Sequence, residues 1–180
     1  MKHTHDRSHS LPMTWPSPPL NIALVEPEIP PNTGNIARLC AATGTRLHLI
    51  EPLGFQLTSA HVRRAGLDYW DSVDMTRHAS LAAFQASQSS PRCFYFSTRA
   101  KRAYTEVTYR AGDTLVFGSE SKGLPDALLD ANEANTLGIP ILTDHVRSLN
   151  LANAVAIVVY EALRQISKKH CTTSITRVVH

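Results

Sequence analysis

Short β-rich runs alternate with segments of helical period along this chain of 180 residues. A strand that pairs in parallel with the next one needs a crossover connection, usually a helix. The alternation therefore predicts an α/β domain with a mostly parallel sheet. The expected strands are Asn21 to Glu26, Arg46 to Ile50, Asp71 to Met75, Cys93 to Ser97, Thr114 to Phe117 and Gly138 to Leu142.

Chain length and composition are those of one globular domain. Hydrophobic residues make up 43% and charged residues 18% of the sequence, which argues against a disordered chain or a coiled coil. We expect a single domain over residues 21–167, a disordered extension over 1–20 and a flexible tail over 168–180. The formal charge of +3 permits nucleic acid as a partner without requiring it.

Residue usage also bears on location and on metal binding. The first 20 residues hold no apolar run long enough for a signal peptide or a membrane helix. The cysteines, Cys40, Cys93 and Cys171, form no C-x-x-C pair, and the histidines show no metal-ligand spacing. These observations predict a cytoplasmic protein with no metal site, no disulfide framework and no contact with a membrane.

The stretch EPEIPPNTGNIARLCAATG, residues 26–44, predicts a helix with two distinct faces. Asn32 is expected to cap its start, and Gly44 is expected to end it. A rotation of about 100° per residue puts Asn35 and Arg38 together on a second face, which either is solvated or meets a ligand. The core-facing stripe consists of Ile36, Leu39, Cys40 and Thr43.

The last predicted helix, Asn150 to Ile166, contains the uncharged run LANAVAIVVY. A helix that is apolar or small nearly all round is buried on more than one side. One side can pack on the sheet, and the other needs a partner. Homodimerisation is the economical explanation, and a helix sunk deep in its own domain is the alternative.

Two polar loops follow predicted strands. LVFGSESKGLP, residues 115–125, has glycines at 118 and 123, which indicate either close approach of a ligand or tight turns. It matches neither the phosphate-loop pattern nor the nucleophile elbow, so a serine hydrolase is disfavoured. In GIPILTDHVRSLNLANA, residues 138–154, Ser148 or Asn150 is expected to cap the last helix.

Three of these stretches, in this order, resemble motifs one, two and three of the SPOUT superfamily of RNA methyltransferases. They are NTGNIAR (32–38), FGSESKGLP (117–125) and IPILTDHVRSLNLANA (139–154). With the flanking phrases RLHLIEPLGF and RRAGLDYW, the chain is similar to the small tRNA (cytidine/uridine) 2′-O-methyltransferases, which modify the wobble ribose of leucine tRNAs. The resemblance spans about residues 21–166.

The resemblance implies helices on both faces of the parallel sheet, a C-terminal trefoil knot and a homodimer. It also implies methyl transfer from S-adenosylmethionine to the 2′-hydroxyl of the wobble pyrimidine of tRNA, with leucine isoacceptors as substrates and no metal. Carried over residue by residue, it assigns cofactor binding to Phe96, Ser97, Thr98, Gly118, Glu120, Gly123, Ile139, Ser148 and Leu149.

The same resemblance assigns catalytic roles. Because arginine stays protonated in proteins, we expect Arg38 to stabilise charge and clamp a phosphate or ribose, while another group removes the proton. Asn35 would orient Arg38 or the substrate, and Tyr160 would reach the partner subunit or the tRNA, or simply pack in the interface. The full catalytic set is Arg38, Asn35, Glu120, Ser148, Asn150 and Tyr160.

Phosphate contacts are expected from basic side chains outside the motifs, since RNA recognition requires them. The candidates are Arg63, Arg64, Lys101, Arg102 and Lys122. The loop TDHVRSLN is one residue longer than the family's usual turn, so residues 142–146 have no counterpart to carry over. Two alternatives stay open: the same methylation on another RNA such as ribosomal RNA, and a SAM- or RNA-binding protein without catalysis.

Overall fold

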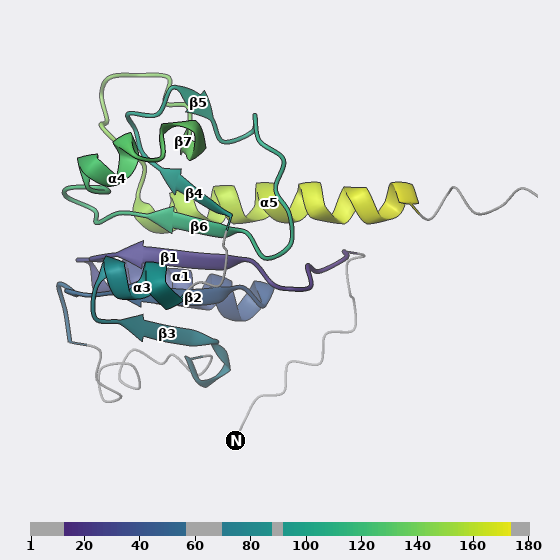
Figure 1. The fold of residues 1–180 in the computed structure, drawn as a ribbon, viewed down its shortest axis with the longest axis horizontal. Helices are drawn as coiled ribbons and strands as arrows, with labels where there is room; N and C mark the ends of the chain where they lie inside the picture. Colours follow the sequence, from purple (N-terminus) through teal and green to yellow (C-terminus); the bar gives the residue numbers. More distant parts are fainter. Residues whose placement is uncertain (1–12, 57–69, 88–91, 174–180) are drawn as a thin grey trace, which may run out of the picture.

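The structure of the protein is a computed structural model that describes residues 13–56, 70–87 and 92–173 (Figure 1). Its elements, in chain order, are β1 (Asn21–Val25), α1 (Pro30–Thr43), β2 (Arg46–Ile50), η1 (Trp70–Ser72), β3 (Met75–His78), α3 (Leu81–Ser87), β4 (Cys93–Phe96), β5 (Arg102–Ala103), β6 (Thr114–Phe117), α4 (Asp126–Asp130), η2 (Glu133–Asn135), β7 (Thr136–Gly138) and α5 (Leu151–Thr173).

Seven strands of the described residues form one sheet in the order β3-β2-β1-β6-β4-β7-β5, and each neighbouring pair is parallel. The predicted α/β architecture with a parallel sheet is confirmed. From β1 the chain runs outward through β2 to β3, and then crosses to the other side of β1. The direction of winding therefore reverses beside β1, which is where open α/β sheets bind ligands, at the carboxyl ends of the strands.

Helices cover both faces of the sheet, as expected: α1 and α5 lie on one face, and α3 and α4 lie on the other (Figure 1). The central strand β1 is apolar throughout because both of its faces are covered. Ile22 and Leu24 enter the core under α1 and α5, whereas Ala23 and Val25 enter the core under α3 and α4. Each of these four residues is at most 2% exposed.

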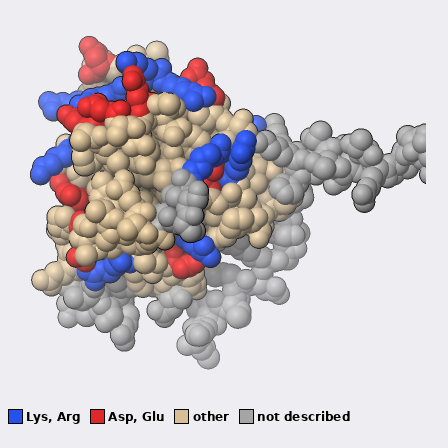
Figure 2. Space-filling view, in the orientation of Figure 1, with Lys and Arg blue, Asp and Glu red and all other residues tan. Residues whose placement is uncertain are grey.

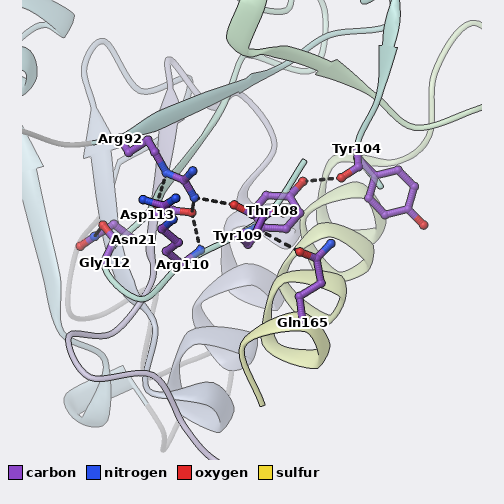
Figure 3. Close-up of polar contacts among 9 residues, drawn as sticks. All are labelled: Asn21, Arg92, Tyr104, Thr108, Tyr109, Arg110, Gly112, Asp113 and Gln165. Carbon is purple, nitrogen blue, oxygen red and sulfur yellow. Dashed lines mark hydrogen bonds and ion pairs between the residues drawn. The ribbon is translucent and has the colours of Figure 1, made fainter. Parts of the chain in front are cut away.

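An ion pair between the half-buried Arg92 and the buried Asp113 fixes the amino ends of the central strands (Figure 3). Arg92 donates from Nε to Asp113 Oδ1 (2.9 Å) and from Nη2 to Oδ2 (2.6 Å), and the N–H of Arg110 also donates to Asp113 Oδ2 (2.7 Å). Nearby, the N–H of Tyr109 donates to Gln165 Oε1 on α5 (3.1 Å). The loop before β6 is thereby tied to β4 and to α5 at the edge of the sheet opposite the strands' carboxyl ends.

Two strand boundaries differ from the expected ones. Residues 71–75 were expected to be a strand, but Trp70–Ser72 forms a 3-10 turn and β3 begins at Met75. Trp70 and Val73 use their apolar side chains to pack on the core from that turn. Gly138 ends β7 instead of beginning a strand, because Pro140 has no N–H to donate to a ladder. The short edge strand β5 was not predicted.

The helix termini also correct the sequence predictions. Asn32 does not cap α1, since the helix begins two residues earlier at Pro30 with Ile29 at the N-cap position. Gly44 does end α1, in a left-handed conformation with φ 66°. Asn150, and not Ser148, caps α5: its Oδ1 accepts the N–H groups of residues 152 and 153 at 2.9 and 3.3 Å.

The structure describes part of each expected terminal segment, residues 13–20 and 168–173. Residues 13–20 lie against the domain: Leu20 is buried, Met13 packs on the core, and the N–H of Thr14 donates to Ser167 Oγ (3.2 Å). At the other end, α5 continues past Ile166 to Thr173. Residues 1–12 and 174–180, which belong to the expected extension and tail, lie outside the described residues.

Candidate active site

A cavity of about 690 Å³ opens at the carboxyl ends of β4, β6 and β7. Its walls are the loops that follow these strands, together with the start of α1 and the start of α5. A cavity of this size, with both apolar and polar lining, suits a ligand the size of a nucleoside derivative. All the residues assigned to the cofactor line it: Phe96, Ser97, Thr98, Gly118, Glu120, Gly123, Ile139, Ser148 and Leu149.

The wall formed by residues 118–123 turns very tightly. A Cβ atom placed on Gly118 would lie 2.0 Å from the carbonyl carbon of Gly123, so no other residue fits there without displacing backbone. Gly123 itself has φ 72°, and its N–H donates to Ser119 O (2.9 Å). Both glycines are thus required by the turn, which presents its backbone to the cavity.

Glu120 joins this loop to the start of α1. Its carboxylate accepts the N–H of Glu28 (2.8 Å), the N–H of Ile29 (3.2 Å) and the side-chain amide of Asn32 (2.8 Å). Helix α1 has no acidic residue in its first turn and no side-chain cap of its own. Pro30 and Pro31 remove two N–H groups that would otherwise need acceptors, and Glu120 supplies the missing negative charge from a distant loop.

The chain of amides that ends at Glu120 has a fixed direction. Asn150 Oδ1 is committed to N–H groups of α5, so Asn150 must donate from Nδ2 to Asn32 Oδ1 (2.9 Å). Asn32 in turn must donate from Nδ2, and only a group that accepts can complete the relay. Glu120 is that group. The relay Asn150–Asn32–Glu120 therefore locks the starts of α1 and α5 and the loop after β6 together around the cavity.

A second contact reinforces this junction from the other direction. Ser121 donates from Oγ to Glu28 Oε1 (2.6 Å) and from its N–H to Glu28 Oε2 (3.1 Å). Ser121 is therefore bonded to a carboxylate. Ser119 Oγ accepts the N–H of Lys122 (3.3 Å). In the described part of the chain neither serine hydroxyl has a hydrogen bond to a histidine, and the arrangement gives no support to a serine hydrolase.

Three of the predicted catalytic residues lie outside the cavity. Asn35 and Arg38 share the exposed face of α1, as the helical spacing predicted. Tyr160 is 50% exposed on α5, beside Ile157, which is 38% exposed. Helices α1 and α5 pack against each other, and these four residues are not among those that line the cavity in the described chain. The structure brings Glu120, Ser148 and Asn150 to the cavity, but leaves the other three on the outer surface of the helical layer.

Helix α5 is exposed on one side, which bears on the two explanations for its apolar composition. Its buried residues form one stripe: Val155, Val158, Val159, Ala162, Leu163 and Ile166. The opposite side, with Ile157 and Tyr160, is not covered by the described part of the same chain. A helix sunk deep in its own domain is therefore wrong, and the second apolar side is available to a partner.

Basic side chains gather at the rim of the cavity. Arg99, Lys122 and Arg147 line it; Arg99 forms an ion pair with Asp126 (2.9 Å). Lys101, further along the same loop, pairs with Glu133 (2.8 Å), and blue and red atoms are interspersed on this part of the surface (Figure 2). Of the predicted phosphate contacts, Lys122 is at the rim, whereas Arg63 and Arg64 lie outside the described residues.

Three residues of this site were not predicted from the sequence. Asn32 was assigned only to capping, although it was the first residue of the stretch NTGNIAR that carried the resemblance. Arg99 and Arg147 directly adjoin Thr98 and Ser148, which the resemblance assigned to the cofactor, and the structure places both arginines in the lining of the same cavity.

Other chemistries find little support. The described residues contain no group of three or more His, Cys, Asp or Glu side chains placed to hold a metal ion. Burial raises the pKa of Cys40, on the core side of α1, to about 12, so this thiol stays protonated and unreactive. Across residues 13–56, 70–87 and 92–173, no helix has the length and apolar character needed to cross a membrane.

Known proteins share much of this sequence. A model of the SpoU rRNA Methylase family matches residues 19–160. The chain is 52% identical over 148 residues to the tRNA (cytidine(34)-2'-O)-methyltransferase of Escherichia coli K12, a match that covers 82% of this chain and 94% of the relative. The corresponding enzyme of Saccharophagus degradans is 51% identical over 147 residues, covering 81% and 95%.

Solved structures agree with the sequence comparison. A structure described as giving insights into the 2-OH methylation of C/U34 on tRNA is 51% identical, with a TM-score of 0.76, and the match covers 81% of this chain and 95% of that one. An AdoMet-bound rRNA methyltransferase from Sinorhizobium meliloti is 25% identical, with a TM-score of 0.69, and the match covers 81% of this chain and 56% of that one.

Proposed function

The chain belongs to the SpoU rRNA methylase family, and we propose that it transfers a methyl group from S-adenosylmethionine to the ribose 2′-hydroxyl of the pyrimidine at position 34 of tRNA. The observation that carries this proposal is the cavity whose walls are the loops after β4, β6 and β7, locked by the relay Asn150–Asn32–Glu120. Relatives that share about half of the sequence over most of the chain carry the tRNA activity in their names.

The cavity fits the cofactor in size and in kind. The absence of a Cβ at Gly118 lets the backbone of the loop after β6 form the cavity wall, as recognition of an adenosine by main-chain groups requires. Phe96, Ile139 and Leu149 add apolar surface for a ring, and Ser97 and Ser148 add hydroxyl groups. When bound there, S-adenosylmethionine would supply an electrophilic methyl group on a sulfonium.

Arg38 would act on the substrate. A ribose hydroxyl is a weak nucleophile, so a group that stabilises negative charge on its oxygen accelerates attack. A guanidinium, which stays protonated, can do this and can clamp the neighbouring phosphate, but it cannot take the proton. Asn35, three residues before Arg38 on the same exposed face of α1, is positioned to orient it.

In a homodimer, Arg38 of one copy would reach the cavity of the other. Arg38 lies on the exposed face of α1 and does not line the cavity of its own chain among the described residues. The neighbouring face of α5 exposes Ile157 and Tyr160, which a second copy would cover. We therefore place Arg38 and Tyr160 at the boundary between two copies, where Arg38 of one copy serves the cavity of the other.

Family membership also supports the finer parts of the account. The trefoil knot would form where the segment before α5 passes through the loops that build the cavity. The presence of tRNA in the cytoplasm makes that compartment the expected location. Leucine isoacceptors are the proposed substrates because the phrases around the first motif resemble those of the leucine tRNA enzymes.

The test is methyl transfer from labelled S-adenosylmethionine to unmodified tRNA transcripts, with ribosomal RNA as the competing substrate. We expect a 2′-O-methylated pyrimidine from position 34 of leucine tRNAs. Arg38→Lys should lose most activity with unchanged tRNA affinity, and full retention would contradict the role given to Arg38. Methylation of ribosomal RNA alone would favour the alternative substrate.

Subunit complementation tests the shared site. Arg38→Ala keeps an intact cavity, whereas Ser148→Trp places a large ring in the exposed wall of the cavity. Each variant alone should be inactive. If Arg38 serves the partner's cavity, mixed dimers of the two variants contain one complete site and regain activity. Mixed dimers with no activity would show that Arg38 acts within its own chain.

A further inference from the structure

The loop between β7 and α5 carries apolar side chains where solvent would be expected. Leu142 is 99% exposed and Val146 is 53% exposed. Ile141 and Arg147, the residues on either side of the segment 142–146, both line the cavity. The segment 142–146, called the lip here, therefore starts and ends at the cavity and stands at its mouth.

Further exposed apolar side chains line the same cavity. Ile29 is 44% exposed and Leu149 is 37% exposed, and both line the cavity. Exposed apolar side chains scattered singly need no explanation, but a group of them around the mouth of a cavity marks a contact surface. The cations Arg99, Lys122 and Arg147 belong to the same rim. Apolar surface framed by cations matches the faces of nucleobases and the phosphates that join them.

The chemistry of the proposed reaction limits what can lie at the mouth. In a ribonucleotide the base is attached to C1′, next to the C2′ that carries the reacting hydroxyl. With the hydroxyl directed into the cavity, the base of the same nucleotide must lie just outside it. We propose that Leu142 and Val146 form an apolar contact for the face of the target pyrimidine, and so help to select the nucleotide that is methylated.

This inference rests on the proposed function and adds a specificity surface to it. A base that has left its stack is held by hydrogen bonds to its edge and by apolar contact with its faces. The lip supplies the second kind of contact. A second copy of the chain, whose Arg38 is proposed to reach this cavity, is the other occupant, but its apolar contact surface is the one on α5, at Ile157 and Tyr160, outside the cavity lining.

The experiment uses anticodon stem-loop RNAs with cytidine at the target position, or with an abasic ribose that keeps the 2′-hydroxyl. The variant is Leu142→Ser with Val146→Ser. Leu142→Met keeps the apolar surface, and Trp15→Ser removes a half-exposed apolar side chain elsewhere. With the unaltered protein, kcat/KM should be about tenfold lower on the abasic RNA than on the cytidine RNA. The abasic RNA has no base whose apolar face can be buried against the protein.

For the double variant, kcat/KM on the cytidine RNA should fall about tenfold, mainly through a higher KM. On the abasic RNA, its kcat/KM should be close to that of the unaltered protein. Leu142→Met, which keeps an apolar side chain, should lose much less than the double variant, and Trp15→Ser should behave like the unaltered protein. The inference would be overturned if the double variant lost the same factor in kcat/KM on both RNAs. It would also be overturned if the double variant dissociated into monomers in sedimentation. If the unaltered protein fails to methylate even the cytidine RNA, the proposed function falls, and the inference falls with it.

Discussion

Replacing Glu120 by glutamine should uncouple the loop after β6 from the start of α1. The carboxylate accepts three hydrogen bonds, and one of its oxygens receives both Ile29 N–H and Asn32 Nδ2. An amide is the same size, but only one of its two arms accepts, so its NH2 would face either the N–H of Glu28 or the donors of Ile29 and Asn32. Asn32 cannot turn its amide round to compensate, because Asn150 donates to its Oδ1 and is itself held by α5.

The loss can be estimated from the contacts. A partly buried donor left without an acceptor costs roughly 1–3 kcal/mol, so Glu120→Gln should lower the free energy of unfolding by about 2 kcal/mol. With a slope of about 2 kcal/mol per molar urea, the unfolding midpoint would fall by about 1 M. Equilibrium urea unfolding, followed by circular dichroism at one protein concentration, measures this directly.

A matched carboxylate provides the control for Glu120. Glu106 is exposed, and its Oε2 accepts one backbone N–H, that of Ala103 (2.9 Å). Glu106→Gln should change the free energy of unfolding by less than about 0.5 kcal/mol. An equal, small effect at both positions would refute the directional relay and leave Glu120 as an ordinary surface carboxylate.

The remaining predictions concern the cavity wall, the amino edge of the sheet and acid stability. Gly118→Ala should abolish S-adenosylmethionine binding in calorimetry, because the new methyl group would collide with backbone; full affinity would contradict the close approach. Asp113→Ala should cost about 2 kcal/mol in urea unfolding, since the hydrogen bonds from Arg92 and from the N–H of Arg110 to this buried carboxylate are lost; a loss below about 0.5 kcal/mol would contradict that role of Asp113. Burial, together with neighbouring His78, lowers the pKa of His48 to about 4 in the folded protein. Below pH 6.5, the ordinary pKa of this group, the unfolded chain therefore binds more protons than the folded one. Stability should therefore fall as the pH drops from about 6.5 towards 4, and His48→Gln should flatten that slope; an unchanged slope would sink the assignment.

Local sequence patterns predicted much of the fold and part of the site. The spacing along residues 26–44 placed Asn35 and Arg38 on one exposed face, because helical geometry is set within a few residues. Central strands such as β1 and β6 were found because burial on both faces requires apolar runs. The edge strand β3 was misplaced, since Thr76 and Arg77 point to solvent and give no such run.

The tertiary arrangement of the site could not be read from the sequence. Nothing near Asn32 indicates that its amide serves a carboxylate 88 residues away, because the relay exists only once three loops meet. The same holds for Arg99 and Arg147, whose place at the rim depends on the order of the strands. The exposure of Leu142 was also unexpected, since an apolar residue after Ile139 and Ile141 suggested a strand.

In the proposed reaction, the acceptor is the 2′-oxygen of nucleotide 34. The most direct measurement is therefore methyl incorporation from labelled S-adenosylmethionine into two leucine tRNAs that differ in one atom, one with ribose and one with 2′-deoxyribose at position 34. We expect about one methyl group per ribose-containing tRNA, and background incorporation into the deoxy tRNA. Equal incorporation into both would contradict it.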